Sequence, residues 1–336
     1  MKATRAAAVV LTAASFLLVG CGSSSSESAA TEGSGDGCGA STSAGAIRVS
    51  FTVARSLGHP VPIVSVCLEG KGPYPFVLSS GAGTSSVIPS LATSLHLIAA
   101  SSQGQVLGVS CIPNAPTVSV RSWSMAGVKL TAQKLQVASL PGEITPRPLG
   151  LIGSDVLARF GAVRVDFRAH ELQTSGPEGA APTSSSLVIG QTSTVPTPGL
   201  VHGTPRAGSP VTVLIGPTGT LMSVPVSLGS SSSSWTVDTG SPNSVVAPGT
   251  ASSAGLTPTG SSAPSWGRGC TGTVPQVASG TWSVNDAALP STALSTQQFP
   301  GAANNTTTGA LGTDVLSTYG SILLDYRHAH LWFGVG

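Results

Sequence analysis

Short apolar stretches, some alternating with polar residues and some continuous, follow one another along most of the chain from residue 46 onward. Val49–Val53 alternates, whereas Pro62–Leu68 is nearly continuous, and residues rich in Gly, Pro and Ser separate such stretches. Alternation with a period of two is typical of half-buried strands, and short apolar runs bounded by turn residues are typical of buried strands. Short helices are expected after Ile88 and over Asp155–Phe160. The pattern therefore predicts an all-β protein.

The same pattern occurs twice. The segment Gly150–Gly161 (GLIGSDVLARFG) matches Gly309–Gly320 (GALGTDVLSTYG), so the two copies lie 159 residues apart. Cys111 and Cys270 obey the same offset. A constant offset between several matching positions indicates a tandem duplication.

The duplication divides the chain into two lobes. We place the first lobe at residues 46–174 and the second at 209–336, joined by a Pro/Ser/Thr-rich linker at 175–208. In the first lobe, Gln103–Ile112 and Thr117–Trp123 are expected to form a hairpin. Two lobes of about 130 residues each can bury a sizeable shared core.

One stretch of the second lobe carries candidate chemistry. A short apolar strand ends in Asp238, Thr239 and Gly240, and Ser241 follows. Together with the segment GALGTDVL that begins at Gly309, this stretch resembles the active-site signature of aspartic peptidases. The resemblance implies two tandem retropepsin-like lobes related by a pseudo-twofold axis, and hairpins at the flap positions. It also implies that Asp238 is catalytic, with Thr239 and Gly240 in the same active-site loop.

The first lobe departs from this signature. At the equivalent positions it has Ser79, Ser80 and Gly81. Peptide hydrolysis in this family needs two facing carboxylates that share one proton, because two like charges so close together cannot both ionise. A serine hydroxyl cannot share that proton. One chain therefore supplies one half of the catalytic pair, Asp238.

Three interpretations of the half pair remain open. The Asp238 lobes of two chains could pair, the lobes of one chain could form a cleft that binds peptides without cleaving them, or Asp238 with a water could retain weak hydrolysis. The linker gives the two lobes of one chain a high effective concentration, which favours a monomeric pseudodimer over a homodimer. We therefore expect an aspartic-type endopeptidase-like protein that hydrolyses or binds extended peptides in a cleft between its lobes. The alternative is an inactive pseudopeptidase that binds peptides or envelope proteins.

Other polar residues of the repeats are interpreted as structural. Asp155 and Asp314 occur in both copies, including the copy without Asp-Thr-Gly, which favours a role such as helix capping. His328 and His330 lie two residues apart without a third ligand nearby. Two histidines alone are weak evidence for a metal site. No metal and no cofactor is expected.

The first residues predict export. Residues 1–20 combine a basic start with an apolar stretch too short to span a bilayer. Leu18–Cys21 resembles the lipobox of bacterial lipoproteins, which implies that Cys21 is lipidated and anchors the protein at the extracytoplasmic face of the cell membrane. Residues 21–45 are rich in Gly and Ser and are expected to form a flexible tether.

Charge is low and balanced. Charged residues make up 8% of the chain, and residues 1–20 hold two of the 15 basic residues and none of the 13 acidic ones. The remainder is therefore formally neutral. A neutral chain without a basic run gives no basis for nucleic-acid binding. The expected partners are a peptide or protein and, through Cys21, a membrane.

Four cysteines follow Cys21, namely Cys38, Cys67, Cys111 and Cys270. An even number of cysteines in an exported protein suggests two disulfides. Cys111 and Cys270 are equivalent positions near the proposed flaps, where a bridge would join the lobes of one chain. A Cys67–Cys111 bridge within the first lobe is the alternative, and the sequence does not choose between them.

Overall fold

The computed structural model describes residues 38, 46–141, 144–178, 186–189, 200, 207–216, 219–285, 287–299 and 307–335, all of which belong to one compact unit, residues 32–336. The predicted signal peptide, Cys21 and most of the predicted tether and linker lie outside the described residues. Within the described ranges, no helix is long and apolar enough to cross a membrane.

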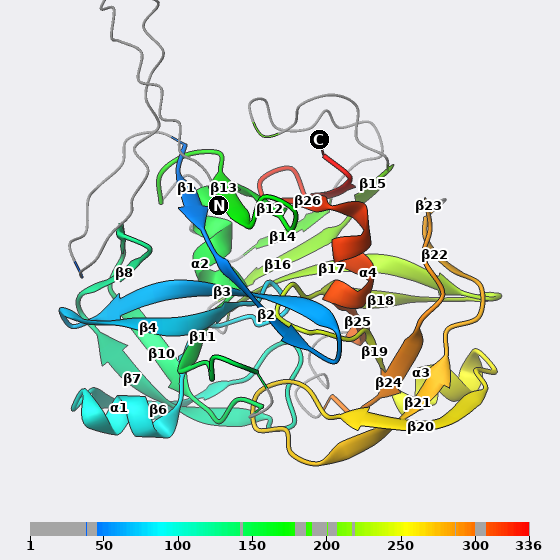
Figure 1. Ribbon diagram of the computed structural model, residues 1–336, viewed down its shortest axis with the longest axis horizontal. Helices are drawn as coiled ribbons and strands as arrows, with labels where there is room; N and C mark the ends of the chain where they lie inside the picture. The colour runs from blue at the N-terminus through cyan, green and yellow to red at the C-terminus, as the bar shows by residue number, and fades with distance from the viewer. Residues whose placement is uncertain are drawn as a thin grey trace, which may run out of the picture. The chain divides into compact units, whose positions relative to one another are not determined.

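The first lobe contains a ten-stranded sheet (Figure 1). Its strands, in chain order, are β2 (Thr52–Ser56), β3 (His59–Leu68), β4 (Lys71–Leu78), β5 (Ser86–Val87), β6 (Ile98–Gln105), β7 (Asn114–Val120), β8 (Trp123–Met125), β9 (Val128–Leu130), β10 (Gln133–Val137) and β11 (Gly150–Ile152). Its helices are α1 (Pro89–Ser94), α2 (Ser154–Leu157) and the 3₁₀ turn η1 (Ala158–Phe160).

The second lobe contains an eleven-stranded sheet of matching order. Its strands are β14 (Ser186–Ile189), β16 (Thr212–Gly216), β17 (Gly219–Leu228), β18 (Ser231–Val237), β19 (Val245–Val246), β20 (Pro258–Pro264), β21 (Thr273–Ala278), β22 (Trp282–Val284), β23 (Ala287–Ala288), β24 (Ala293–Thr296) and β25 (Thr307–Leu311). Its helices are α3 (Pro248–Ser253), α4 (Thr313–Leu316) and the 3₁₀ turn η3 (Ser317–Tyr319).

A six-stranded sheet joins the lobes. Its order is β1-β13-β12-β26-β27-β15, built from β1 (Arg48–Ser50), β12 (Ala162–Asp166), β13 (Glu171–Thr174), β15 (Ala207–Pro210), β26 (Ser321–Asp325) and β27 (His330–Phe333). The central pair, β12 and β26, is antiparallel, and Arg164 lies opposite Leu323. These two residues are equivalent in the repeat, so the pseudo-twofold axis relating the lobes passes between them.

The offset of 159 residues holds throughout this architecture. Helices α1 and α3, helices α2 and α4, and strands β12 and β26 have bounds that coincide after the shift. Both α1 and α3 begin with a proline, whose fixed φ suits the first turn of a helix. Apolar side chains from the sheets of both lobes form one continuous core. The predicted all-β class with two tandem lobes related by a pseudo-twofold axis is confirmed.

The hairpins of the two lobes differ in extent from the prediction. Strands β6 and β7 begin and end earlier than expected, and residues 106–113 between them leave the sheet. We call residues 106–113 tip one, and the equivalent residues 265–272, between β20 and β21, tip two. Figure 1 shows both hairpins along its lower edge. The tips leave their sheets because their backbone groups bond to other segments, as described below.

Candidate active site

The loops Ser79–Gly81 and Asp238–Gly240, called the signature loops, begin at equivalent strand ends. Strands β4 and β18 each pair in parallel with a later strand, β11 or β25. Just beyond β4, the Ser79 amide donates to the Ile152 carbonyl at 2.9 Å, and just beyond β18 the Asp238 amide donates to the Leu311 carbonyl at 2.9 Å. The same local pairing therefore brings Ser79 and Asp238 to the interface between the lobes.

The loops interlock through reciprocal hydrogen bonds. Thr239 Oγ1 donates to the Leu78 carbonyl at 2.8 Å, and Ser80 Oγ donates to the Val237 carbonyl at 2.7 Å. The Ser80 amide donates to Thr239 Oγ1, and the Thr239 amide to Ser80 Oγ, both at 3.1 Å. Each bond has a symmetry-related counterpart. The Ser80 hydroxyl takes part in two of these hydrogen bonds, as the Thr239 hydroxyl does from the other lobe.

Asp238 binds Ser79 across the interface. Its Oδ1 accepts hydrogen bonds from Ser79 Oγ at 2.9 Å, from the Gly240 amide at 2.9 Å and from the Gly81 amide at 3.3 Å. The residue is only 2% exposed. Burial raises the pKa of Asp238, and the three hydrogen bonds together with the charge of Arg268 oppose the rise.

Close approach of the loops explains the glycine in each signature. A Cβ on Gly81 would lie 2.3 Å from Asp238 Cγ, and a Cβ on Gly240 would lie 2.5 Å from Ser79 Cβ. Both distances are too short for carbon atoms that are not bonded. Only glycine at these positions lets the loops face each other.

The pairing of one carboxyl, Asp238, with one hydroxyl, Ser79, limits the acid–base chemistry of the site. In a carboxylate dyad, one group acts as a base on water while the other donates a proton to the substrate. Ser79 holds its proton firmly and uses it to bind Asp238. The described residues of this site therefore provide one acid–base group, Asp238, and a neutral donor.

Tip one lies directly on the first-lobe loop. The Gly83 amide donates to the Leu107 carbonyl at 3.0 Å, and the Val109 amide donates to the Gly81 carbonyl at 3.3 Å. These contacts form an antiparallel β-bridge beside the Ser79 loop. Tip one thus pairs with the backbone of this loop in the manner of a short strand.

Tip two inserts one side chain, Arg268, into the first lobe. Arg268 Nη1 donates to the carbonyl and Oγ1 of Thr84, at 3.1 and 3.2 Å, and to Gln136 Oε1. Nη2 donates to the Leu107 carbonyl in tip one. The side chain is among the largest that are fully buried. Arg268 therefore links tip two, tip one and the first-lobe sheet.

The charge of Arg268 persists despite burial. Loss of hydration lowers its pKa to about 10, and the nearby carboxylates of Asp155 and Asp238 oppose that change. A guanidinium with this pKa is cationic at neutral pH. It is the buried cation that acts on Asp238.

The described residues form two disulfides, one of which links the two tips. Cys111 of tip one is bonded to Cys270 of tip two, with the Cα atoms 4.9 Å apart. A second disulfide joins Cys38 to Cys67 in β3. Of the pairings left open by the sequence, the structure contains the bridge between the lobes rather than a Cys67–Cys111 bridge.

A small cavity of about 20 Å³, room for about one water molecule and partly open to solvent, remains beside Asp238 and Ser79. Asp238, Ser79 and Arg268 supply polar atoms to its lining. Trp266 and aliphatic residues of the first lobe, among them Val77 and several in 140–151, form its apolar walls. Arg268 Nε has no hydrogen-bond partner.

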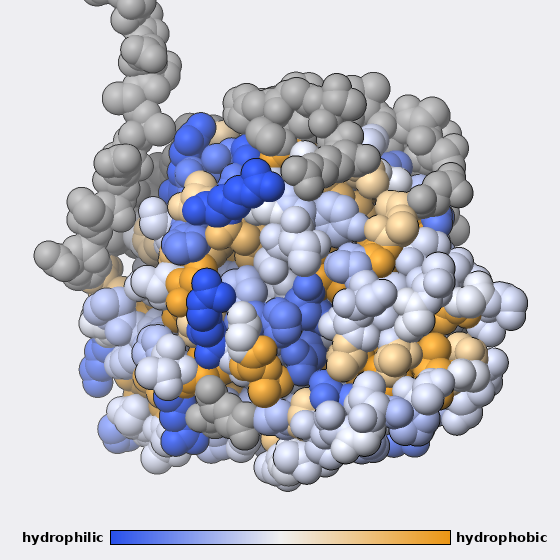
Figure 2. All heavy atoms as spheres, turned by 45° about the vertical axis from the view of Figure 1, so that its right-hand side comes forward, coloured by the Kyte–Doolittle hydropathy of each residue, from blue (hydrophilic) through white to orange (hydrophobic). Residues whose placement is uncertain are grey.

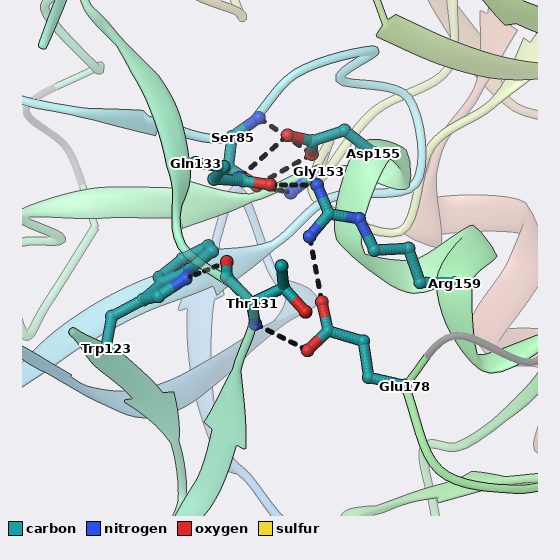
Figure 3. A network of polar contacts seen from close by, with 8 residues as sticks. All are labelled: Ser85, Trp123, Thr131, Gln133, Gly153, Asp155, Arg159 and Glu178. Atoms are coloured by element: carbon teal, nitrogen blue, oxygen red, sulfur yellow. Dashed lines mark hydrogen bonds and ion pairs between the residues drawn. The ribbon is translucent and has the colours of Figure 1, made fainter. Parts of the chain in front are cut away.

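The carboxylates of Asp155 and Asp314 have structural partners. Asp155 Oδ1 accepts from the Ser85 amide at 2.9 Å and from Ser85 Oγ at 2.7 Å, and Oδ2 accepts from Gln133 Nε2 at 3.0 Å (Figure 3). In the second lobe, Asp314 accepts from Ser244 Oγ at 2.8 Å. These side chains hold the segment that follows Ser79–Gly81 or Asp238–Gly240. Asp314 Oδ1 also accepts from the Val315 amide at 3.0 Å, in the first turn of α4.

His328 and His330 each contact a nearby side chain. His328 Nδ1 lies 2.9 Å from Asp325 Oδ2, and His330 stacks on Trp332. Within the described ranges, no group of three or more His, Cys, Asp or Glu residues could hold a metal ion.

Sequence reasoning missed Arg268. Its partners lie more than 130 residues away in sequence, so no local pattern could identify them. The available signal was an isolated cation between Gly267 and Gly269, two residues before Cys270, in a chain with few charges.

Comparison with known proteins gives likenesses among solved structures alone. No protein-family model and no curated protein matches this sequence. An aspartic proteinase from Irpex lacteus is 12% identical, with a TM-score of 0.41 over 86% of this chain and 97% of that chain. A retropepsin-like aspartic protease from Rickettsia conorii is 18% identical, with a TM-score of 0.28 over 41% of this chain and 95% of that chain.

Proposed function

We propose that this chain is a non-hydrolytic, aspartic-peptidase-like protein that binds an extended polypeptide in the cleft between its lobes. One observation carries the proposal. Ser79 stands where a second carboxylate would be needed, and its hydroxyl donates to Asp238 Oδ1 at 2.9 Å. Asp238 therefore has a donor as its cross-interface partner rather than an acid–base group with which to share a proton.

The charge of the site also favours binding over hydrolysis. Hydrolysis by a dyad requires a proton that moves between two carboxyls near the attacking water. Arg268 instead supplies a fixed positive charge, which opposes the rise that burial causes in the pKa of Asp238. Asp238 is a single carboxyl and can act as base or as acid but not as both at once, and the Ser79 hydroxyl replaces neither role.

The backbone of the cleft supports a polypeptide as ligand. Tip one binds the Gly81 carbonyl and the Gly83 amide in the manner of a short strand. An extended peptide can use the same groups by strand addition once tip one moves aside.

The surface shown in Figure 2 carries small hydrophobic groups among polar atoms rather than one broad patch. The face shown therefore offers a peptide no large apolar docking surface.

The proposal includes a membrane tether and a monomer. The short apolar stretch in residues 1–20, Cys21 and the Gly/Ser-rich segment after it support lipid anchoring at the extracytoplasmic face. The interlocked loops support pairing of the lobes within one chain, so that no second chain is needed to form the cleft.

The experiment combines cleavage and binding with one probe, fluorescein-labelled carboxymethylated casein. Wild type and Asp238→Asn are incubated with it from pH 3 to 7, both oxidised and after treatment with dithiothreitol, at several protein concentrations. We expect no cleavage by either protein, and binding to the same extent by both under at least one redox condition. Fluorescence anisotropy measures binding, and gel electrophoresis measures cleavage.

Two outcomes contradict the proposal. Cleavage with an acidic optimum that disappears in Asp238→Asn would establish a peptidase, and a second-order dependence on protein concentration would place the dyad between two chains. Absence of binding in both redox states would remove the peptide-binding function.

A further inference from the structure

We infer that the Cys111–Cys270 disulfide is a redox latch on the cleft: a dithiol reductant that cleaves it frees tip one and exposes the loop beside Asp238. The inference rests on the proposed function, because the opened cleft is where the polypeptide would bind. It adds the condition under which binding occurs.

The position of the disulfide sets what it holds together. Cys111 and Cys270 occupy equivalent places in the two tips, and the bond joins them across the interface between the lobes. Beside it, the Cys111 amide donates to the Arg268 carbonyl at 2.9 Å, and Ser110 Oγ donates to the same carbonyl at 3.1 Å. The covalent bond is thus the strongest link between the tips.

The lobes themselves do not depend on this link. The six-stranded sheet joins them through β12 and β26, and the signature loops interlock. Reduction therefore leaves the lobes paired. Its effect is confined to the tips.

The two tips are anchored unequally. In tip two, the Trp266 amide donates to Gln297 Oε1 at 3.0 Å, and Gln297 Nε2 donates to the Trp266 carbonyl at 2.7 Å. Arg268 adds its buried contacts with the first lobe. Tip one has two backbone bonds to the loop at Gly81–Gly83, together with its contacts to tip two. Residues 106–110 of tip one are buried, so opening after reduction must also overcome that burial and the contacts of tip one with Arg268. Tip two keeps its anchors on Gln297 and on the first-lobe sheet, so in this proposal tip one is the half that moves.

The chemistry of opening follows from the exposure of the two sulfurs. Cys111 is partly exposed, whereas Cys270 is 4% exposed. A reductant thiolate attacks Cys111 Sγ, forming a mixed disulfide and releasing the Cys270 thiolate, which then takes up a proton. Gln297 Nε2, 3.3 Å from Cys270 Sγ, can donate a hydrogen bond to that leaving thiolate. The mixed disulfide joins Cys111 Sγ to one sulfur of the reductant. The second thiol of the same reductant molecule attacks that reductant sulfur, which releases Cys111 as a thiol and leaves the reductant as a disulfide.

The test compares three forms of the full chain in detergent. The latch variant is Cys111→Ser/Cys270→Ser, and the matched control is Cys38→Ser/Cys67→Ser, which removes the other disulfide. Hydrogen exchange of the tip one amides reports opening. Anisotropy of the labelled casein reports binding. If the latch variant does not fold, wild type folded with its disulfides and then treated with dithiothreitol replaces it.

We expect exchange in tip one to be about tenfold faster or more in the latch variant than in wild type, and casein affinity to rise by a similar factor. The control should match wild type in both measurements. Unchanged exchange in the latch variant, or equal opening in the control, overturns the latch. Faster exchange without casein binding supports the latch and refutes the peptide-binding function. Oxidised wild type that binds casein as tightly as the latch variant supports the function and refutes the latch.

Discussion

Replacing Arg268 by methionine should destabilise the folded protein strongly and make its stability more sensitive to pH. Methionine is unbranched and can fill much of the space of the buried side chain, so the loss reports mainly on the guanidinium. The wild-type side chain donates to oxygens of Thr84, Gln136 and Leu107, all in the first lobe. The variant leaves these acceptors without their charged donor.

The magnitude follows from those contacts. Of the four acceptor atoms, the Leu107 carbonyl still accepts from the Gly83 amide. A buried acceptor left without a partner costs about 1–3 kcal/mol, so losing the donor to both Thr84 oxygens and to Gln136 Oε1 would cost several kcal/mol if none found another donor. The variant also avoids burying a cation, which offsets part of the loss. Removal of one partner from a buried charged group typically costs about 3–5 kcal/mol in total. We expect a loss in this range at pH 7.

The pH dependence has a definite sign. Burial already raises the pKa of Asp238, and Arg268 opposes the rise, so the variant should raise this pKa further. A carboxyl with a higher pKa in the folded state gives its full stability below its unfolded pKa of about 4 and loses it as the pH rises through the folded pKa. Asp238 therefore costs the variant more at pH 7 than at pH 4. The difference between wild type and variant should widen over that interval.

Urea unfolding at pH 4, 5.5 and 7, extrapolated linearly to zero urea, measures these free energies. The control is Arg48→Met, because Arg48 is half exposed and lies 3.6 Å from Glu171. Loss of this surface ion pair should lower the free energy of unfolding by less than about 1 kcal/mol. A loss in Arg268→Met no larger than in the control, or a difference that stays constant from pH 4 to 7, would refute the role of Arg268 as the counter-ion of Asp238.

Two further predictions concern Asp238 and Cys21. Asp238→Asn keeps an oxygen acceptor and removes a buried group whose pKa is raised, so it should be more stable than wild type at pH 7, with the gain vanishing toward pH 3. Thermal unfolding across this pH range tests it, and a destabilised variant at pH 7 would show that attraction to Arg268 outweighs burial. Cys21→Ser should move the protein from the membrane fraction to the soluble exported fraction and abolish labelling by a palmitate analogue. Unchanged labelling would refute lipidation at Cys21.

The sequence was informative where the structure depends on local signals. Helices α1 and α3 start at prolines, strands follow the apolar stretches, and the repeat at 159 residues carries these elements from one lobe to the other. The duplication also predicts which loops meet, because a pseudo-twofold axis relates equivalent residues. Ser79 and Asp238 are such a pair.

The arrangement of the tips could not be predicted in the same way. The predicted hairpin treated Gln103–Ile112 as a strand, whereas residues 106–113 leave the sheet to contact the first-lobe loop and tip two. Such contacts depend on how two lobes pack, which a periodic pattern in one segment does not encode. The same reason hid the partners of Arg268 and left the pairing of Cys111 open.

Asp238 makes contacts between the lobes that involve no catalysis. Asp238 Oδ1 accepts three hydrogen bonds, from Ser79, Gly81 and Gly240, and two of these donors belong to the opposite lobe. Two facing carboxyls would require a shared proton to avoid repulsion, so their attraction would depend on pH. A carboxylate facing a hydroxyl matches acceptor to donor at any pH where Asp238 is ionised. In this interface, Asp238 and Ser79 therefore form a hydrogen bond between the lobes without needing a shared proton.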